Sequence, residues 1–164
     1  MDAMTDPQSE AFKQSFRRHA AGVAAITSTS PDGRPVGFTA TSLASLAATP
    51  PLVTFNMSRV SSAWPAMVVG NHVAIHTLGP RSMDVAIRLA ADNAVRFAGD
   101  HWHPGPHGVP ILHDVTSWML GRIIEIVPVH GNAVVIAEIE SGSLGESDEA
   151  LIYHERSYLK PAAL

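Results

Sequence analysis

Hydroxyl side chains and one arginine are concentrated between Gly37 and Pro65. Each hydroxyl group turns to donate or accept a hydrogen bond, whereas a guanidinium presents a fixed fork of N–H donors. Together these groups suit a phosphate that carries a planar polar ring, and a flavin nucleotide is the ligand that we expect. The residues concerned are Thr39, Thr41, Ser42, Ser45, Ser58, Arg59, Ser61 and Ser62.

A helix is expected to begin near Ser62, immediately after the second half of this polar set. Pro65 fits the first turn of such a helix, where its missing N–H has no intrahelical partner, so Ser61 or Ser62 is a natural N-cap. The free amides and the dipole at a helix N-terminus favour an anion. The sequence therefore predicts that Arg59 and its neighbouring serines surround the phosphate end of the ligand.

Two more helices follow from the spacing of apolar residues. After a loose tail of residues 1–8, a single domain is expected over 9–164, and Ser9 is the expected cap of its first helix. Phe12 and Phe16 lie on one stripe of that helix, which indicates packing, and Gly22 is expected to end it. In a helix that opens after Pro80, the expected packing face comprises Met83, Ile87 and Ala90.

The rest of the chain is rich in β-type runs, which favours an antiparallel barrel over a doubly wound sheet. Gly37 lies inside one of these runs, where a missing side chain suits the close approach of a flat group or a partner chain. Residues 92–114 contain three Gly and three Pro and are expected to form a long loop. The expected strands span 23–29, 35–40, 42–48, 52–57, 72–78, 117–128, 133–144 and 151–158.

Composition excludes several classes of protein. The net charge of −4 argues against nucleic-acid binding, which requires a basic face. The chain has no Cys, so redox chemistry has to come from a bound cofactor. It also has no apolar run long enough to span a membrane, and its start is polar and acidic where a signal peptide would be basic and apolar. We therefore expect a cytoplasmic protein without a membrane partner.

The ordered set of motifs resembles the flavin reductase family, the small NAD(P)H-dependent partners of two-component monooxygenases. The resemblance extends over about residues 10 to 160 and is specific as a set. It is carried by Phe16-Arg17-Arg18, Gly22-Val23, Gly37-Phe38-Thr39-Ala40-Thr41-Ser42, Pro50-Pro51-Leu52-Val53, Ser58-Arg59, Ser61-Ser62, Pro65, Arg96-Phe97-Ala98-Gly99, Trp102, Gly105-Pro106, Gly108-Val109-Pro110-Ile111-Leu112, Leu151-Ile152-Tyr153-His154 and Tyr158.

The resemblance implies a mainly β, FMN-binding split β-barrel of antiparallel Greek-key type with flanking helices. It also implies a homodimer with the flavin near the interface, FMN or FAD as flavin, and NADH or NADPH as donor. Hydride would pass to the flavin, and the reduced flavin would serve a partner monooxygenase. The implied ring contacts are Thr39, Thr41 and Ser42; the implied phosphate contacts are Ser58, Arg59, Ser61 and Ser62; further cofactor-binding residues are Ala40, Ser45, Asn56, Trp102 as a lid, and Tyr158.

Residues on the nicotinamide side follow the family pattern less closely. The expected candidates are His154, His130 and Asn132, because Asn132 stands where many members carry a histidine. His76 replaces an asparagine common in the family. Two alternatives remain: a flavin-binding protein in which these changes remove pyridine-nucleotide turnover, and a split-barrel oxidase acting on a pyridoxamine phosphate. A vitamin phosphate would need more cations than the single Arg59, which disfavours the oxidase.

A cluster of histidines offers a different chemistry. His101, His103 and His107, with His113 nearby, have a spacing at which imidazoles bind zinc or another divalent metal. The segment is rich in Pro and Gly, and the resembled family has no metal there. We therefore expect these side chains to be surface loop residues and expect no metal site.

Overall fold

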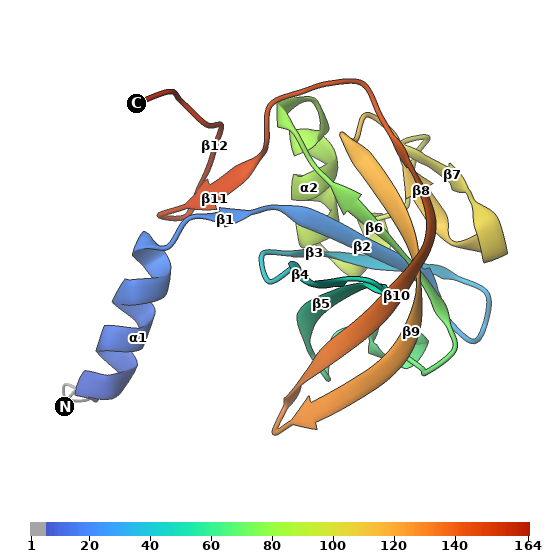
Figure 1. Cartoon of the computed structure of the whole chain (residues 1–164), viewed down its shortest axis with the longest axis horizontal. Helices are drawn as coiled ribbons and strands as arrows, with labels where there is room; N and C mark the ends of the chain where they lie inside the picture. Colours follow the sequence, from blue (N-terminus) through green and yellow to red (C-terminus); the bar gives the residue numbers. More distant parts are fainter. Residues whose placement is uncertain (1–5) are drawn as a thin grey trace.

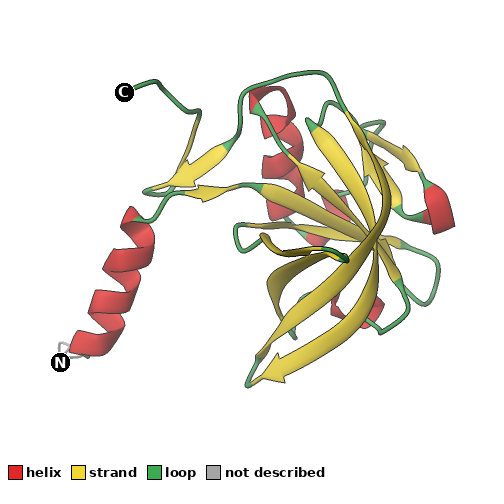
Figure 2. Cartoon of the chain, viewed as in Figure 1, coloured by secondary structure: helices red, strands yellow, loops and turns green. Residues whose placement is uncertain are grey.

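Antiparallel strands are the commonest regular element of the structure, a computed structural model that describes residues 6–164 (Figure 1). The helices and strands alternate little, as the colouring by secondary structure shows (Figure 2). In chain order the elements are α1 (Pro7–Arg18), β1 (Ala21–Gly22), β2 (Ala24–Thr29), β3 (Pro35–Ala40), β4 (Ala44–Ala48), β5 (Pro51–Ser58), η1 (Trp64–Ala66), β6 (His72–Thr77), η2 (Pro80–Ser82), α2 (Met83–Ala90), η3 (Asn93–Val95), β7 (Trp102–Pro104), η4 (Pro106–Gly108), β8 (Pro110–Leu112), β9 (Ser117–Val129), β10 (Asn132–Leu144), β11 (Ile152–His154) and β12 (Ser157–Leu159).

One seven-stranded sheet forms the body of the protein, in the order β3-β2-β6-β9-β10-β5-β4. Alternate residues of its strands point to a common interior, where Ile26, Phe55 and Ile123 are fully buried. The rings of Phe38 on β3 and Phe55 on β5 lie 6.1 Å apart although their strands are well separated in the sheet order. The sheet is therefore strongly curled around its core, and the expectation of a mainly β, antiparallel split barrel is confirmed.

The two longest strands, β9 and β10, are antiparallel neighbours in the sheet and are joined by a turn at His130-Gly131. Register shifts occur between Ile136 and Ala137 and between Ile139 and Ser141. Such bulges increase local twist and bend a strand, which helps the sheet to curl. The turn of this hairpin lies next to the end of β5, because Asn132 is the register partner of Ser58.

Helix α2 lies against the outer face of the sheet (Figure 1). It covers a second apolar cluster there. The helix buries Val85, Ala86 and Leu89 there, whereas Met83 and Ile87 are exposed. The expected face of α2 was therefore wrong. Both stripes of this short helix are apolar, so periodicity alone does not select the one that meets the sheet.

Residues 92–114 are more ordered than the expected long loop. They contain two short 3₁₀ turns and the β7–β8 hairpin, which packs against the outer face of the sheet. The Thr27 hydroxyl donates to the Pro110 carbonyl at 2.5 Å, and the Thr29 hydroxyl donates to the Gly108 carbonyl at 3.1 Å. These side-chain bonds from β2 hold the segment in place, and such long-range partners leave no local pattern in the sequence.

Helix α1 projects from the body of the molecule (Figure 1). It begins at Pro7, two residues earlier than Ser9, and Asp6 is its cap because the Asp6 carboxylate accepts from the Gln8 N–H at 3.4 Å. It ends at Arg18 instead of reaching Gly22. None of its residues is buried by the part of the chain that the structure describes, so the expected packing of its aromatic stripe is not seen there. The part of the predicted tail in residues 1–5 lies outside the described residues.

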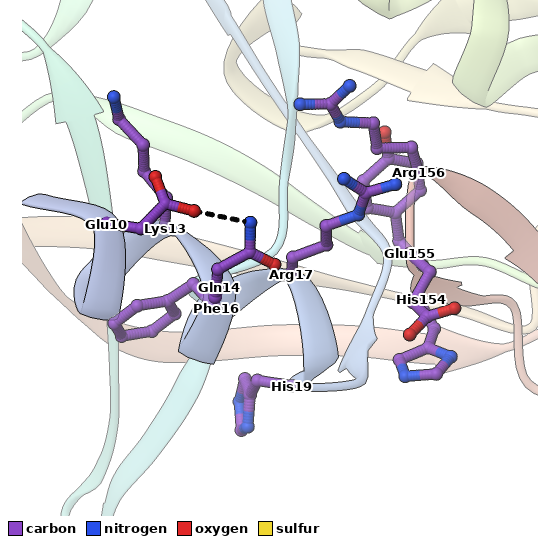
Figure 3. Close-up of a pocket in the computed structure, with 10 residues that line it drawn as sticks. Glu10, Lys13, Gln14, Phe16, Arg17, His19, His154, Glu155 and Arg156 are labelled. Atoms are coloured by element: carbon purple, nitrogen blue, oxygen red, sulfur yellow. Dashed lines mark hydrogen bonds between the residues drawn. The ribbon is translucent and has the colours of Figure 1, made fainter. Parts of the chain in front are cut away.

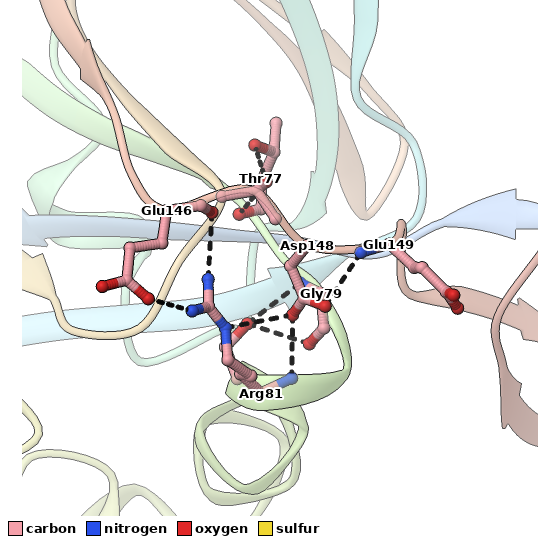
Figure 4. A network of polar contacts seen from close by, with 8 residues as sticks. Thr77, Gly79, Arg81, Glu146, Asp148 and Glu149 are labelled. Carbon is pink, nitrogen blue, oxygen red and sulfur yellow. Dashed lines mark hydrogen bonds and ion pairs between the residues drawn. The ribbon is translucent and has the colours of Figure 1, made fainter.

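Arg81, next to α2, fastens the segment that follows β10 (Figure 4). Its backbone N–H donates to the Asp148 carboxylate at 3.0 Å, and its guanidinium donates to the Glu146 carbonyl at 2.9 Å and pairs with the Glu146 carboxylate. The backbone N–H of Arg81 is the main cause that lowers the pKa of the Asp148 carboxyl.

No helix within residues 6–164 is long and apolar enough to cross a membrane.

Candidate functional site

The end of β5 and the β9–β10 turn form the centre of the candidate site. Ser58 lies opposite Asn132 in the β5–β10 ladder. The Arg59 backbone N–H donates to the Gly131 carbonyl at 2.9 Å, and its guanidinium Nη1 donates to the His130 carbonyl at 3.1 Å. The expected phosphate residues and two of the expected nicotinamide-side residues are therefore neighbours. The backbone carbonyls that create this contact left no signal in the side-chain pattern.

The Arg59 side chain is exposed, but contacts with Trp64 and the His130 carbonyl hold its orientation. Its guanidinium carbon lies 5.7 Å from the ring centroid of Trp64, a distance at which an aromatic face attracts a cation. The spacing of residues in the sequence did not indicate this partner. Within residues 6–164 the one hydrogen bond of the guanidinium is to His130, so its other N–H groups are available to an anion.

Two serines next to Arg59 have hydroxyl groups suited to an anion. The Ser58 Oγ accepts from the Val60 N–H at 3.3 Å, and the Ser61 Oγ accepts from the Ala63 N–H at 3.3 Å. Since these bonds use the oxygen as acceptor, each hydroxyl hydrogen remains to be donated. Ser62 differs, because its hydroxyl bonds to the Asn93 side-chain oxygen at 3.1 Å.

The helix expected near Ser62 is absent. The segment forms only the 3₁₀ turn Trp64–Ala66, with Pro65 in its first turn as expected and no side-chain cap. A single short turn leaves few free amides and carries little dipole, so the expected anion attraction at a helix N-terminus does not apply. The anion-binding capacity depends instead on Arg59 and the serine hydroxyls.

The residues expected on the ring side of a flavin lie around the ends of β3 and β4. The Ser42 Oγ accepts from the Asn56 N–H at 2.9 Å, which joins this group to β5. Ala40 is buried in the core, and Thr41 is exposed just beyond β3. Ser45 lies on β4 in a shallow, mainly apolar groove of about 510 Å³ that also includes Leu43, Leu52, Met119 and Ile139.

Trp102 and Tyr158 lie elsewhere, packed on the cluster under α2. The Trp102 indole N–H donates to the Phe97 carbonyl at 3.0 Å, and the two rings meet edge to face. Trp102 thus lies in the short strand β7 and is held by Phe97, and its role as a lid over the flavin stays a prediction. Burial raises the pKa of the Tyr158 hydroxyl, with a smaller contribution from Tyr153, whose ring lies 5.4 Å away.

His154 lies at a third place, where the β11–β12 turn meets α1 (Figure 3). Its Nε2–H donates to the Arg18 carbonyl at 3.0 Å. The surrounding pocket of about 430 Å³ is also lined by Lys13, Arg17 and Arg156. Because β11 belongs to a separate three-stranded sheet, His154 does not join Arg59 and Asn132 within one chain.

His76 is a structural residue here. It is fully buried, its Nδ1–H donates to the Ala25 carbonyl at 3.1 Å, and its Nε2 accepts from the Leu112 N–H at 3.1 Å. Burial, partly opposed by the bond to Ala25, lowers the pKa of His76 to about 4. Both nitrogens are used within the fold, so this departure from the family pattern leaves no open nitrogen for a nicotinamide.

The four histidines considered for a metal divide among three neighbourhoods. The His101 Nε2–H donates to the Arg96 carbonyl at 2.7 Å, and His103 and His113 are joined by a bond of 2.9 Å. His107 instead stacks on His72. These four histidines therefore do not meet at one point, as the disfavoured metal-site alternative would require.

Comparison with known proteins agrees with this architecture. The model of the flavin reductase like domain matches residues 16–161. The chain belongs to the flavin reductase-like family. A solved flavin reductase domain protein from Arthrobacter sp. FB24 is 48% identical and has a TM-score of 0.90, covering 94% of this chain and 96% of that one.

Two curated relatives have more specific names. An NADH:FMN oxidoreductase from Rhodococcus qingshengii is 37% identical over 158 residues, which is 93% of this chain and 82% of the relative. The reductase subunit HsaB of a flavin-dependent monooxygenase from Mycobacterium tuberculosis is 30% identical over 141 residues, which is 86% of this chain and 74% of the relative.

The donor set near the β9–β10 turn fits a flavin nucleotide. Arg59 supplies a charge for a phosphate, and Ser58 and Ser61 supply hydroxyl hydrogens beside it. The bond between Ser42 and Asn56 connects these donors to the residues that follow β3.

Proposed function

We propose that this chain takes a hydride from NADH or NADPH, reduces FMN or FAD, and supplies the reduced flavin to a partner monooxygenase. The observation that carries the proposal is the joining of Arg59 and Ser58 to the His130–Asn132 turn. Arg59 thereby provides a positive charge for a phosphate, and the polar groups of Ser58 and the His130–Asn132 turn lie next to it. The names of the NADH:FMN oxidoreductase and the monooxygenase reductase subunit among the relatives support the same activity.

When bound, the flavin supplies the hydride-accepting chemistry, so the protein needs no nucleophile of its own. In our proposal Arg59, Ser58 and Ser61 hold the phosphate end. Thr39, Thr41 and Ser42 lie along the ring, and binding energy at the phosphate fixes the ring at reacting distance from the nicotinamide. The Asn132 side chain and the turn at His130, whose carbonyl accepts from Arg59, would then contact the nicotinamide ring.

A homodimer is part of the proposal. Phe12 and Phe16 on α1 are 64% and 62% exposed, and their rings lie 4.9 Å apart, so residues 6–164 leave an apolar stripe uncovered. An isolated helix of this length is marginal in water and needs packing on its apolar face. A second copy is the occupant that we propose for α1, and it would also bring a second His154 into the assembly.

The decisive experiment is anaerobic. Purified protein is mixed with FMN or FAD and then with NADH or NADPH, and loss of the flavin's visible absorption is followed. Rapid bleaching with one pair is expected and would name flavin and donor. Flavin binding without bleaching by either donor would favour a flavin-binding protein that lacks turnover, and no flavin binding would contradict the proposal.

Cytoplasmic location remains a prediction that cell fractionation tests.

A further inference from the structure

Two imidazoles and one carboxylate meet on the surface of the sheet, away from the residues assigned to the flavin. His72 begins β6, His107 lies in η4 and Glu140 lies on β10. Their possible metal-ligand atoms all lie within 4.8 Å of one another. These three residues come from segments that are far apart in the sequence, so the spacing of the histidines did not indicate them.

The fold fixes two of the three side chains. The His72 Nε2–H donates to the Glu140 Oε2 at 3.2 Å, and the His72 side chain is mostly covered. Arg122, the register partner of His72 on β9, donates from Nε to the Glu140 Oε1 at 3.0 Å. Glu140 is therefore oriented by Arg122 through one oxygen, while its other oxygen faces the imidazole.

His107 is brought to this pair by an unusual backbone conformation. Its φ of 56° and ψ of 19° are left-handed, which is uncommon for a residue other than glycine. The bond from Thr29 to the Gly108 carbonyl and the bond from the Gly105 N–H to the Val109 carbonyl, at 2.8 Å, hold the loop on either side. The His107 ring then lies parallel to the His72 ring, with centroids 3.7 Å apart and planes at 4°.

We propose that His72, His107 and Glu140 bind one divalent transition-metal ion of the zinc type. Two imidazoles and a carboxylate, completed by water, are a ligand set that zinc accepts. Ligand atoms of a tetrahedral zinc lie roughly 3.3 Å apart, given bonds of about 2.0 to 2.1 Å. Because parallel rings direct their lone pairs side by side, the exposed His107 ring turns toward the ion. His72 binds the ion through Nε2 as the neutral tautomer that carries its proton on Nδ1.

Such an ion would join η4 to β6 and β10. It would thereby fasten to the main sheet the β7–β8 hairpin, whose Leu112 N–H donates to the buried His76. The proposed role is structural stabilisation at a distance from the flavin-binding residues. It is independent of the reductase activity, so each can be tested without the other.

The test measures zinc binding by protein that carries no affinity tag, in competition with a chromophoric chelator. We expect one Zn²⁺ per chain. His107→Ala and Glu140→Gln should each weaken binding at least about tenfold, since even the loss of an outer-shell partner commonly costs that much. Both residues are exposed or half-exposed, so neither change should unfold the protein.

His103→Ala and His113→Ala serve as matched controls, because these histidines pair with each other and not with Glu140. Both should retain the zinc affinity of the unmodified chain. Zinc should also raise the melting temperature of the unmodified protein but not that of His107→Ala. Equal binding by all variants, loss of binding in the controls, or no binding at all would overturn the site.

Discussion

Arg59 shows how one side chain acquires a role through its backbone neighbours. Its amide and its guanidinium both donate to carbonyls of the β9–β10 turn, and Trp64 lies beside its charge. These contacts reduce the freedom of a long side chain before any ligand is bound. A preorganised cation loses less conformational entropy on binding a phosphate than a free one.

Arg59→Ala should weaken flavin affinity by about 1.5 to 3 kcal/mol, the range for a hydrogen bond to a charged group. A titration that follows quenching of flavin fluorescence measures the change. Arg122→Ala is the matched control, since Arg122 pairs with Glu140 on another part of the sheet. Equal affinity in Arg59→Ala and the unmodified protein would reject the phosphate assignment.

His76 predicts a pH dependence of stability. Its pKa is lowered to about 4 in the folded chain, whereas an unfolded histidine titrates near 6.5. Between these values the unfolded chain binds the extra proton, so the free energy of unfolding should fall as the pH is lowered from 6.5 to 4. The shift corresponds to a loss on the order of 3 kcal/mol over that range.

Denaturant unfolding at several pH values, compared between the unmodified protein and His76→Gln, isolates this contribution. The variant should lose the part of the slope that lies between pH 6.5 and 4. If the variant does not fold, NMR titration of the unmodified protein decides the question. A His76 ring signal that titrates near the ordinary histidine value of about 6.5 would contradict the assignment.

At the scale of elements, the segment 93–97 is fastened to β3 through Gly37. Arg96 Nη1 donates to the Gly37 carbonyl at 2.8 Å, and the Phe97 ring lies over the glycine. A flat group was expected to approach Gly37, and the ring of Phe97 is that group. This contact places η3, and with it Asn93, next to Ser62 at the edge of the proposed flavin site.

Gly37→Ala should destabilise the protein by about 1 to 3 kcal/mol, as overpacking of a filled site does. A Cβ at this position would lie 2.9 Å from the Ile26 carbonyl oxygen and 2.9 Å from the Phe97 ring. Gly22→Ala is the control, because no atom lies within 4 Å of the corresponding Cβ. Urea unfolding measures both, and similar stabilities for the two variants would contradict the packing argument.

At the scale of the whole molecule, the residues associated with flavin and nicotinamide divide among three places. Arg59 and Asn132 share one place, Trp102 and Tyr158 a second, and His154 a third. The projecting α1 and its exposed phenylalanines explain how a second chain would change this arrangement. The proposed active unit is therefore larger than one chain.

Phe12→Ser combined with Phe16→Ser should weaken the proposed dimer at least about tenfold, since burial of a phenylalanine contributes about 1.5 to 3 kcal/mol. Light scattering coupled to size exclusion, over a series of concentrations, measures the change. Gln14→Ser on the same helix is the control, because Gln14 is exposed and bonds only Glu10 among the described residues. A monomeric unmodified protein would contradict the proposal.

The sequence alone determined the chemistry of the candidate ligand, the mainly β architecture and the resemblance to the family. Hydroxyl groups and a guanidinium have the same donors in any fold, and strand periodicity is a local property. The positions of most strands, including those that become β2, β5 and β10, followed from that periodicity.

Only the tertiary structure decided which apolar stripe of α2 is buried, and that Ser62 is followed by a 3₁₀ turn instead of a helix. It also decided that His76 is enclosed between Ala25 and Leu112, and that His107 meets His72 and Glu140. Each of these outcomes depends on a partner far away in the sequence. The local sequence pattern shows which interactions a side chain is able to make. Burial and register across the sheet determine which residue it contacts.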